Sequence, residues 1–391
     1  MNNLHIKRIT AVTEVFPDGQ KCTGVELSYD CIFKEEMVTR EDFEVQNRTV
    51  LSASVRPGKG EGGCTVYLAL SPDDRDAATY LPPGPPSEGG MAHVIPARVR
   101  VAQIHNLTAE DGSRIPEAPC DENDAVRNFL VDEFIQGEFE GLAYNLFVPR
   151  NYDAAKKYPL VQFIHDASVC SDEVLCTLAQ GVGALVWMTE EAQAKQECFV
   201  LAPQFAPPTI VEDNGWVDER LETEKRLLDK IVRDYSIDPS RLYTTGQSMG
   251  CMSSMVLNLR YPNLFAASFF VAGQWDERQF RGSGLQNKNF WFLNSQGDAK
   301  AFPGMNQILV VLEREGAKVA REVWRADEFQ ETYRKKLEKL AATGANMIYT
   351  PYEITTVADG WHSGGGEHHV TTWKHAYGIE AVREWMFSKK L

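Results

Sequence analysis

The pattern of apolar residues changes near residue 125, and this change limits the folds that the chain can adopt. From Ile6 to about Asp111, short β-rich runs alternate with turn clusters such as "PDG" and "RPGKGEGG", without a convincing amphipathic helix. After about residue 125, strand-like runs alternate with helix-like runs, which is the pattern of an open α/β sheet. Because 391 residues exceed the usual size of one hydrophobic core, we expect two domains.

The sequence predicts a smaller all-β sandwich over residues 1–122 and an α/β domain over residues 123–391. The boundary is placed in the polar, acidic segment "EAPCDENDAV", and the Gly/Pro-rich stretch 82–90 is expected to be a surface loop of the first domain. In the second domain, the runs "YPLVQFIH", "FVLAPQ", "RLYTTG", "FAASFFVAG" and "NFWFLN" predict strands. Helices are predicted over 216–235, 249–262 and 305–319.

Composition excludes several classes of protein. The net charge of -15 argues against a nucleic-acid or anionic-membrane surface. No apolar run is long enough to span a bilayer and no signal peptide is recognised, so we expect a cytoplasmic protein, although a cloned mature form of a secreted protein would look the same. The eight cysteines are scattered without a CxxC pair, which predicts neither a zinc site nor a disulfide scaffold.

The clearest indication of chemistry is "GQSMG" at residues 246–250, between a predicted strand and a predicted helix. A G-x-S-x-G pattern in that context is typical of a nucleophile elbow, which would lift the hydroxyl of Ser248 clear of the sheet. Gly246 and Gly250 are expected where a side chain would collide with the neighbouring strand or helix. The N–H of Met249, at the start of the helix, would then point toward a tetrahedral oxyanion.

A serine nucleophile needs an imidazole base that is oriented by a carboxylate, and in this fold class the chain order is Ser, acid, His. Asp298 follows the apolar run "FWFLNSQG" and is the candidate acid, with Asp276 as the alternative. The residues alone leave the base open among four late histidines: His362, His368, His369 and His375. Their glycine-rich, irregular stretch lacks the spacing of a metal-binding helix, so no metal is predicted.

Residues 126–391 resemble the α/β-hydrolase superfamily, in particular esterases related to polyhydroxybutyrate depolymerases, feruloyl esterases and prolyl-oligopeptidase-like hydrolases. The resemblance rests on "YNLFVPRNYDAAKKYPLVQFIHDAS", "YSIDPSRLYTTGQSMG" and "HHVTTWKHAYGIEAVREWMFS". It implies that His369 is the base, with His368 as the alternative, and that the N–H of Ala167 is a second oxyanion donor. His165 matches a structural histidine of the group. Asp166 replaces a glycine, which is unfavourable beside an oxyanion unless its carboxylate points away.

The β-rich half resembles the immunoglobulin-like domain that precedes the hydrolase in some thermophilic bacterial esterases. Such a domain is expected to cover one side of the active-site entrance or to mediate self-association into a homo-oligomer. Trp216, Trp275 and Trp361 fall in loops near the predicted catalytic residues, and with Gln247 they are the candidates for a substrate pocket. The alternative for each tryptophan is packing in the core or between the domains.

Taken together, these features predict a serine carboxylesterase that acts on small-molecule esters with short acyl or aryl groups, without a cofactor. Two alternatives stay open. One is a prolyl-oligopeptidase-like serine peptidase, which uses the same triad. The other is a polymer- or carbohydrate-binding protein whose hydrolase-like domain no longer catalyses.

Overall fold

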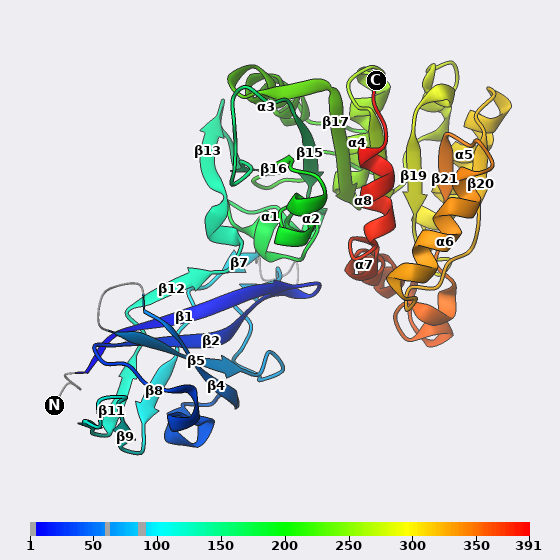
Figure 1. Cartoon of the computed structure of the whole chain (residues 1–391). Helices are drawn as coiled ribbons and strands as arrows, with labels where there is room; N and C mark the ends of the chain where they lie inside the picture. The colour runs from blue at the N-terminus through cyan, green and yellow to red at the C-terminus, as the bar shows by residue number, and fades with distance from the viewer. Residues whose placement is uncertain (1–4, 59–62, 85–90) are drawn as a thin grey trace. The chain divides into compact units, whose positions relative to one another are not determined.

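The computed structural model describes residues 5–58, 63–84 and 91–391, and these form two compact units (Figure 1). The first unit contains Met1–Leu81 and Val94–Asp132, and the second contains Pro82–His93 and Glu133–Leu391. Residues 85–90 of the predicted surface loop lie outside the described residues. Ala92, just after them, is fully buried in the second unit, where its carbonyl accepts a hydrogen bond from Ser171 Oγ at 2.8 Å.

The first unit is a sandwich of two sheets. A five-stranded sheet has the order β12-β1-β2-β5-β4, and a three-stranded sheet has the order β11-β8-β3. Alternate residues of β5 are buried, and Val66 and Leu68 share one core with Val45 and Val101 of the smaller sheet. The strands of these sheets are β1 (Ile6–Phe16), β2 (Gly19–Tyr29), β3 (Phe43–Val45), β4 (Val50–Pro57), β5 (Cys64–Leu70), β8 (Arg100–Gln103), β11 (Ala118–Glu122) and β12 (Ala125–Asn128). The predicted boundary at 122 falls between β11 and β12, whereas the first unit continues to Asp132.

The second unit contains a nine-stranded sheet with the order β13-β14-β16-β15-β17-β18-β19-β21-β20. Its first three strands pair antiparallel and the others pair parallel, which confirms the predicted mostly parallel α/β sheet. The strands are β13 (Ile135–Phe139), β14 (Leu142–Phe147), β15 (Tyr158–Ile164), β16 (Phe199–Gln204), β17 (Ile237–Gln247), β18 (Ala267–Val271), β19 (Phe290–Leu293), β20 (Val319–Arg321) and β21 (Met347–Tyr349).

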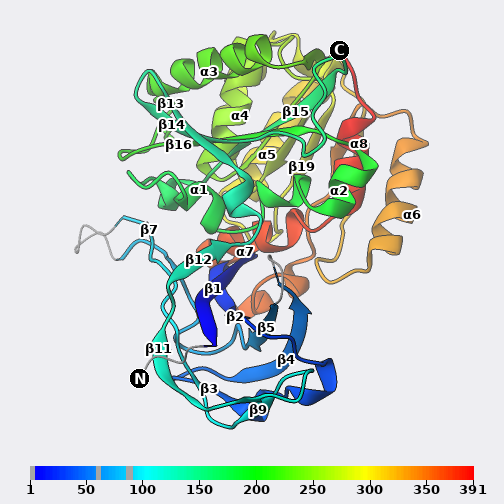
Figure 2. The same cartoon turned by 60° about the vertical axis from the view of Figure 1, so that its left-hand side comes forward.

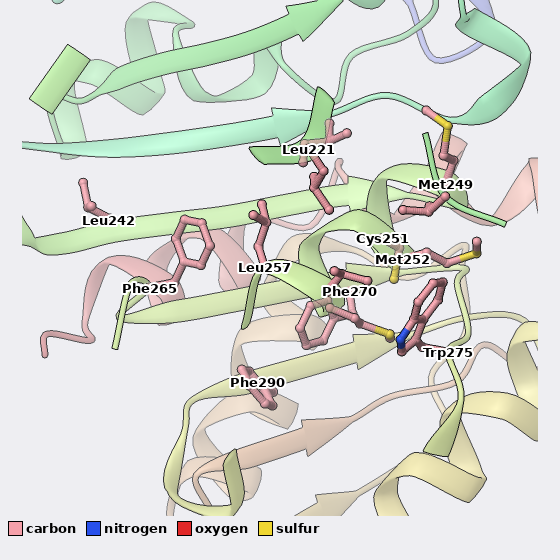
Figure 3. Close-up of a cluster of buried hydrophobic side chains, with 14 of the residues drawn as sticks. Leu221, Leu242, Met249, Cys251, Met252, Leu257, Phe265, Phe270, Trp275 and Phe290 are labelled. Atoms are coloured by element: carbon pink, nitrogen blue, oxygen red, sulfur yellow. The ribbon is translucent and has the colours of Figure 1, made fainter. Parts of the chain in front are cut away.

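Helices cover both faces of this sheet (Figure 2). One face carries α3 (Arg220–Asp234), α4 (Met249–Arg260) and α5 (Ala301–Arg314), and the other carries α2 (Glu190–Lys195), α6 (Gln330–Ala341) and α8 (Glu380–Phe387). The central strand β15 is buried on both faces, as its continuous apolar run predicts. Leu160 and Ile164 join the apolar cluster around α3 and α4, part of which is drawn in Figure 3, while Phe163 packs edge-to-face against Tyr377.

Two details of the predicted helices are wrong. The helix predicted over 305–319 ends at Arg314, and β20 begins at Val319. The histidine-rich stretch, read as irregular because of its glycines, forms helix α7 (Gly365–Ala376). Its glycines lie at the first turn, and Gly365 serves close packing there, because a Cβ on it would approach Ala299 Cβ to 2.8 Å. None of the described helices combines the length and apolar character that a bilayer span requires.

Candidate active site

Ser248 occupies a strained turn between β17 and α4. Its backbone has φ 51° and ψ -116°, a conformation that residues other than glycine rarely adopt. A Cβ on Gly246 would lie 2.6 Å from Ile164 O, and one on Gly250 would lie 1.9 Å from the same oxygen. The turn therefore needs glycine on both sides of the serine, and its geometry is that of a nucleophile elbow.

His369 and Asp298 complete a hydrogen-bonded chain with this serine. His369 Nε2 lies 2.8 Å from Ser248 Oγ, and His369 Nδ1 lies 2.6 Å from Asp298 Oδ2. The ring stands edge-on to Trp373, with 5.2 Å between the ring centroids. With the proton on Nδ1 donated to the carboxylate, Nε2 is free to accept the serine proton.

The carboxylate of Asp298 is fixed by the backbone at the start of α5. Its side chain is buried, and Oδ1 accepts hydrogen bonds from the N–H groups of Lys300 at 3.0 Å and Ala301 at 2.8 Å. These two N–H donors hold the carboxylate in place. Oδ2 is thereby left to orient the imidazole of His369.

The other candidate residues have different partners. His368 is buried, with Nδ1 3.0 Å from Ser295 Oγ and Nε2 2.7 Å from Gly360 O, so both of its ring nitrogens are engaged. Asp276 caps the 3-10 helix Glu277–Phe280 and pairs with Arg278. His362 is exposed at the end of the 3-10 helix Gly360–His362, and burial lowers the pKa of His375 beside Tyr352.

The two candidate oxyanion donors each begin a helix. Met249 is the first residue of α4, and Ala167 is the first residue of the 3-10 helix Ala167–Val169 and lines the cavity at Ser248. Backbone N–H groups in a first helical turn have no partner within the helix, which leaves them available to an anion.

Asp166, which replaces the expected glycine, is held by three hydrogen-bond donors. Its Oδ1 accepts from Ser168 N–H at 2.9 Å and from Ser168 Oγ–H at 2.5 Å, and its Oδ2 accepts from Gln247 Nε2 at 2.9 Å. The carboxylate therefore caps the 3-10 helix that carries Ala167 and ties it to the residue before Ser248. The Asp166 carboxylate, which the sequence indicates to be unfavourable beside an oxyanion, thus stabilises the segment that carries Ala167.

His165 links the end of β15 to the loop after β16. It is fully buried, its Nδ1–H donates to Asp166 O at 2.7 Å, and its Nε2 accepts from Phe205 N–H at 3.0 Å. Burial lowers the pKa of His165, which keeps the ring neutral and able to accept that hydrogen bond. This environment is that of a structural histidine.

A cavity of about 680 Å³ opens over Ser248. Its lining includes the apolar side chains of Val211, Met249 and Met252, and the polar side chains of Asp213, Gln274 and Lys300 at its rim. Most of these cavity-lining residues are not predicted from the sequence. Met252 could have been found, because it lies one helical turn after Met249. Asp213 and Lys300 come from distant loops, and no local pattern marks them.

Four residues were predicted to form the substrate pocket: Gln247, Trp216, Trp275 and Trp361. All four are described by the structure, and none of them lines this cavity. Gln247 is buried and donates to both Asp166 Oδ2 and Gln180 Oε1. Trp275 is buried in the apolar cluster around α4 (Figure 3), whereas the exposed fractions of Trp216 and Trp361 are 43% and 75%. Trp275 contributes to the lining of a neighbouring cavity instead. A loop position does not determine the direction of its side chain.

Comparisons with known proteins agree with this architecture. Residues 8–116 match the family model described as the esterase Ig-like N-terminal domain. The solved structure of a thermostable esterase superposes with a TM-score of 0.79 at 23% identity, covering 99% of this chain and 100% of that chain. The fold predicted from the sequence, an α/β hydrolase after an immunoglobulin-like domain, is confirmed.

Two curated proteins match short parts of the chain. Acetylxylan esterase A of Emericella nidulans is 29% identical over 92 residues, which is 20% of this chain and 30% of that protein. Poly(3-hydroxyalkanoate) depolymerase C of Paucimonas lemoignei is 41% identical over 69 residues, 18% of this chain and 16% of that protein. The chain thus spans less than a third of either relative.

Proposed function

We propose that this protein is a serine hydrolase of carboxylic esters, with Ser248 as nucleophile, His369 as general base and Asp298 as the group that orients the base. The observation that carries the proposal is the hydrogen-bonded chain of these three side chains beneath an open cavity. Support for ester substrates comes from the names of the relatives, an acetylxylan esterase and a polyester depolymerase.

The proposed reaction has two halves. Ser248 Oγ attacks the ester carbonyl carbon while its proton moves to His369 Nε2, and the N–H groups of Met249 and Ala167 receive the oxyanion. The intermediate collapses, and the leaving alcohol takes the proton from His369. Water, deprotonated by His369, then attacks the acyl-enzyme and releases the acid. Asp298 stabilises the imidazolium in both halves, and no step calls for a cofactor.

The cavity suits small esters. Its volume of about 680 Å³ lies within the range of small-molecule sites, roughly 300–1,000 Å³. Val211, Met249 and Met252 offer an apolar surface to an acyl or aryl group near Ser248. We therefore propose short-chain acyl or aryl esters as the substrates.

Hydrolysis of 4-nitrophenyl esters from acetate to decanoate tests this function, with Ser248→Ala beside wild type and Ser283→Ala as a matched control. We expect Ser248→Ala to lose about a thousandfold or more in kcat and Ser283→Ala to keep wild-type activity. Wild-type turnover in Ser248→Ala would rule out the nucleophile. Inactivity on every ester with cleavage of a peptide amide would instead favour a peptidase.

A further inference from the structure

Three loops meet at the rim of the cavity over Ser248. The Asp213 carboxylate binds Lys300 Nζ through Oδ2 and Gln274 Nε2 through Oδ1, each at 2.5 Å. Asp213 follows β16, Gln274 follows β18, and Lys300 follows β19 and the acid Asp298. Burial alone would raise the pKa of Asp213, but the hydrogen bonds from Lys300 and Gln274, together with the charge of Lys300, lower it overall. The contact of Asp213 with Lys300 is therefore an ion pair. We call Asp213, Gln274 and Lys300 the rim bridge.

A second cavity, of about 700 Å³, lies on the other side of the rim bridge. Both cavities are lined by all three rim-bridge residues and by Asn214. The second cavity is more polar than the first, because Asp276, Glu277, Arg278 and Gln307 contribute to its lining. Two cavities with different chemistry therefore share one wall.

We propose that the rim bridge is a gate between the two cavities, and that the second cavity binds the far, polar and uncharged end of a long ester. This inference rests on the proposed ester hydrolysis at Ser248. The first cavity accommodates the apolar part of the substrate next to the carbonyl, and opening the gate lets a longer chain continue into the second cavity. The rim bridge then sets how long a substrate the enzyme prefers.

Breaking the contacts of the rim bridge requires little free energy. The exposed fractions of the Lys300 and Asp213 side chains are 70% and 48%, and such exposed ion pairs contribute little to stability and weaken with salt. Gln274 Oε1 is buried without a hydrogen-bond partner in the described part of the chain, so rotation of the amide breaks no bond of that oxygen. The charges in the second cavity are partly paired, with Arg278 bound to Asp276, which favours a neutral guest.

The test compares a long polar ester with a short ester on each side of the ester bond. On the acid side, the 4-nitrophenyl ester of 2-[2-(2-methoxyethoxy)ethoxy]acetic acid is paired with 4-nitrophenyl acetate. On the alcohol side, the acetate of tri(ethylene glycol) monomethyl ether is paired with ethyl acetate. In Asp213→Asn and in Lys300→Met we expect the long-to-short ratio of kcat/KM to rise about tenfold over wild type on one side of the ester. Lys230→Met, which removes an ion pair with Asp234 on α3, is the control and should leave both ratios unchanged.

Two further variants identify the gate and the second cavity. The double variant of Asp213→Lys with Lys300→Asp exchanges the two charges and restores an ion pair, and Gln274 can turn its Oε1 toward the new lysine. The long-to-short ratio of kcat/KM should therefore return to the wild-type value. Gln307 lies on the exposed side of α5, and Gln307→Phe narrows the second cavity. When it is added to Lys300→Met, it should remove the rise in the long-to-short ratio of kcat/KM.

Each outcome is decisive. Unchanged ratios in both single variants, with ester hydrolysis that still depends on Ser248, would overturn the gate and leave the proposed function standing. A gain that survives Gln307→Phe would overturn the second cavity as the binding site, and failure of the charge exchange to restore the ratio would overturn the ion pair as the gate. If no ester is hydrolysed, or if Ser248→Ala is as active as wild type, the proposed function itself fails.

Discussion

At the scale of single residues, two adjacent histidines on α7 have opposite environments. Successive helical residues point about 100° apart, and His369 accordingly faces the cavity while His368 is buried with both ring nitrogens engaged. Only His369 has a ring nitrogen within hydrogen-bonding distance of Ser248 Oγ. The first prediction concerns this division of roles.

We expect His369→Gln to lower kcat by about a thousandfold or more without loss of stability, because the serine loses its base. We expect His368→Leu to retain His369-dependent catalysis but to lower the free energy of unfolding by about 1–3 kcal/mol, because it removes the hydrogen bonds of the buried imidazole with Ser295 Oγ and Gly360 O. Steady-state kinetics and urea unfolding of both variants measure these effects. The reverse assignment follows if His369→Gln stays active and a folded His368→Leu is inactive.

The amino-acid sequence predicts only part of the candidate site. The order of Ser248, Asp298 and a late histidine could be predicted, because strand ends on one edge of a parallel sheet lie close together. The choice among four histidines could not, since it depends on side-chain direction within a helix that was itself read as irregular. Side-chain direction also separates the three tryptophans: Trp216 and Trp361 do not line the cavity at Ser248, whereas Trp275 lines the second cavity.

At the scale of elements, the 3-10 helix Ala167–Val169 carries the proposed second oxyanion donor. Ala167 is its first residue, and Asp166 before it has φ -78° and ψ 169°, an extended conformation that is compatible with a following proline. Proline is tolerated at a first helical position, where it removes one N–H group and keeps the backbone path.

Ala167→Pro should therefore lower kcat by about 10²–10³-fold, the loss that follows removal of one oxyanion donor, with little change in thermal stability. Ala167→Ser retains the N–H group and should stay within a few-fold of wild type. A proline variant that is folded and fully active would remove Ala167 from the oxyanion hole.

A second element-scale feature is the contact between α4 and the segment after β18. A Cβ on Gly273 would lie 2.6 Å from both Cβ and Sγ of Cys251, and 3.1 Å from Ser248 O. The buried thiol of Cys251 thus occupies space that a glycine at 273 leaves free. The thiol fits at this position because its partner residue, which is distant in sequence from the elbow, is a glycine.

Gly273→Ala should lower the free energy of unfolding by about 1–3 kcal/mol through overpacking. Cys251→Gly costs about 1 kcal/mol as a glycine in a helix interior, yet the double variant should be more stable than the sum of the two single effects. Urea unfolding of all four proteins in a double-mutant cycle gives the coupling. Strict additivity would show that the two positions do not share this space.

At the scale of the whole molecule, the carboxyl of Glu224 on α3 is the buried group with the clearest effect on stability. It is fully buried and has no hydrogen-bond partner in the described residues. Burial raises its pKa to about 8, with a smaller contribution from Asp229, so it is neutral in the folded protein near pH 7. The unfolded chain loses this proton above the ordinary pKa of about 4.3.

Between about pH 4.3 and 8 the folded state holds a proton that the unfolded state has released, so this carboxyl makes the protein less stable as pH rises. Glu224→Gln removes the titration. The free energy of unfolding of Glu224→Gln minus that of wild type should increase from pH 5 to 8, by at most about 1.4 kcal/mol per pH unit, and become constant above pH 8. Urea unfolding of both proteins from pH 5 to 9 measures this, and a difference independent of pH would contradict it.

The overall architecture was the part most open to prediction. Runs such as residues 158–164, buried on both faces, and the alternation of strands and helices after residue 125 determine a parallel sheet with few alternatives. The cavity was not predictable, because Asp213, Gln274 and Lys300 meet only after the loops of three separate strands have folded.

Labelling with diisopropyl fluorophosphate, followed by peptide mass spectrometry, tests whether Ser248 forms the covalent intermediate. We expect one equivalent of label on the peptide containing Ser248, with loss of ester hydrolysis in proportion to labelling and little labelling of His369→Gln. Ester hydrolysis that persists after complete labelling of Ser248, or inhibition with the label on another residue, would contradict it.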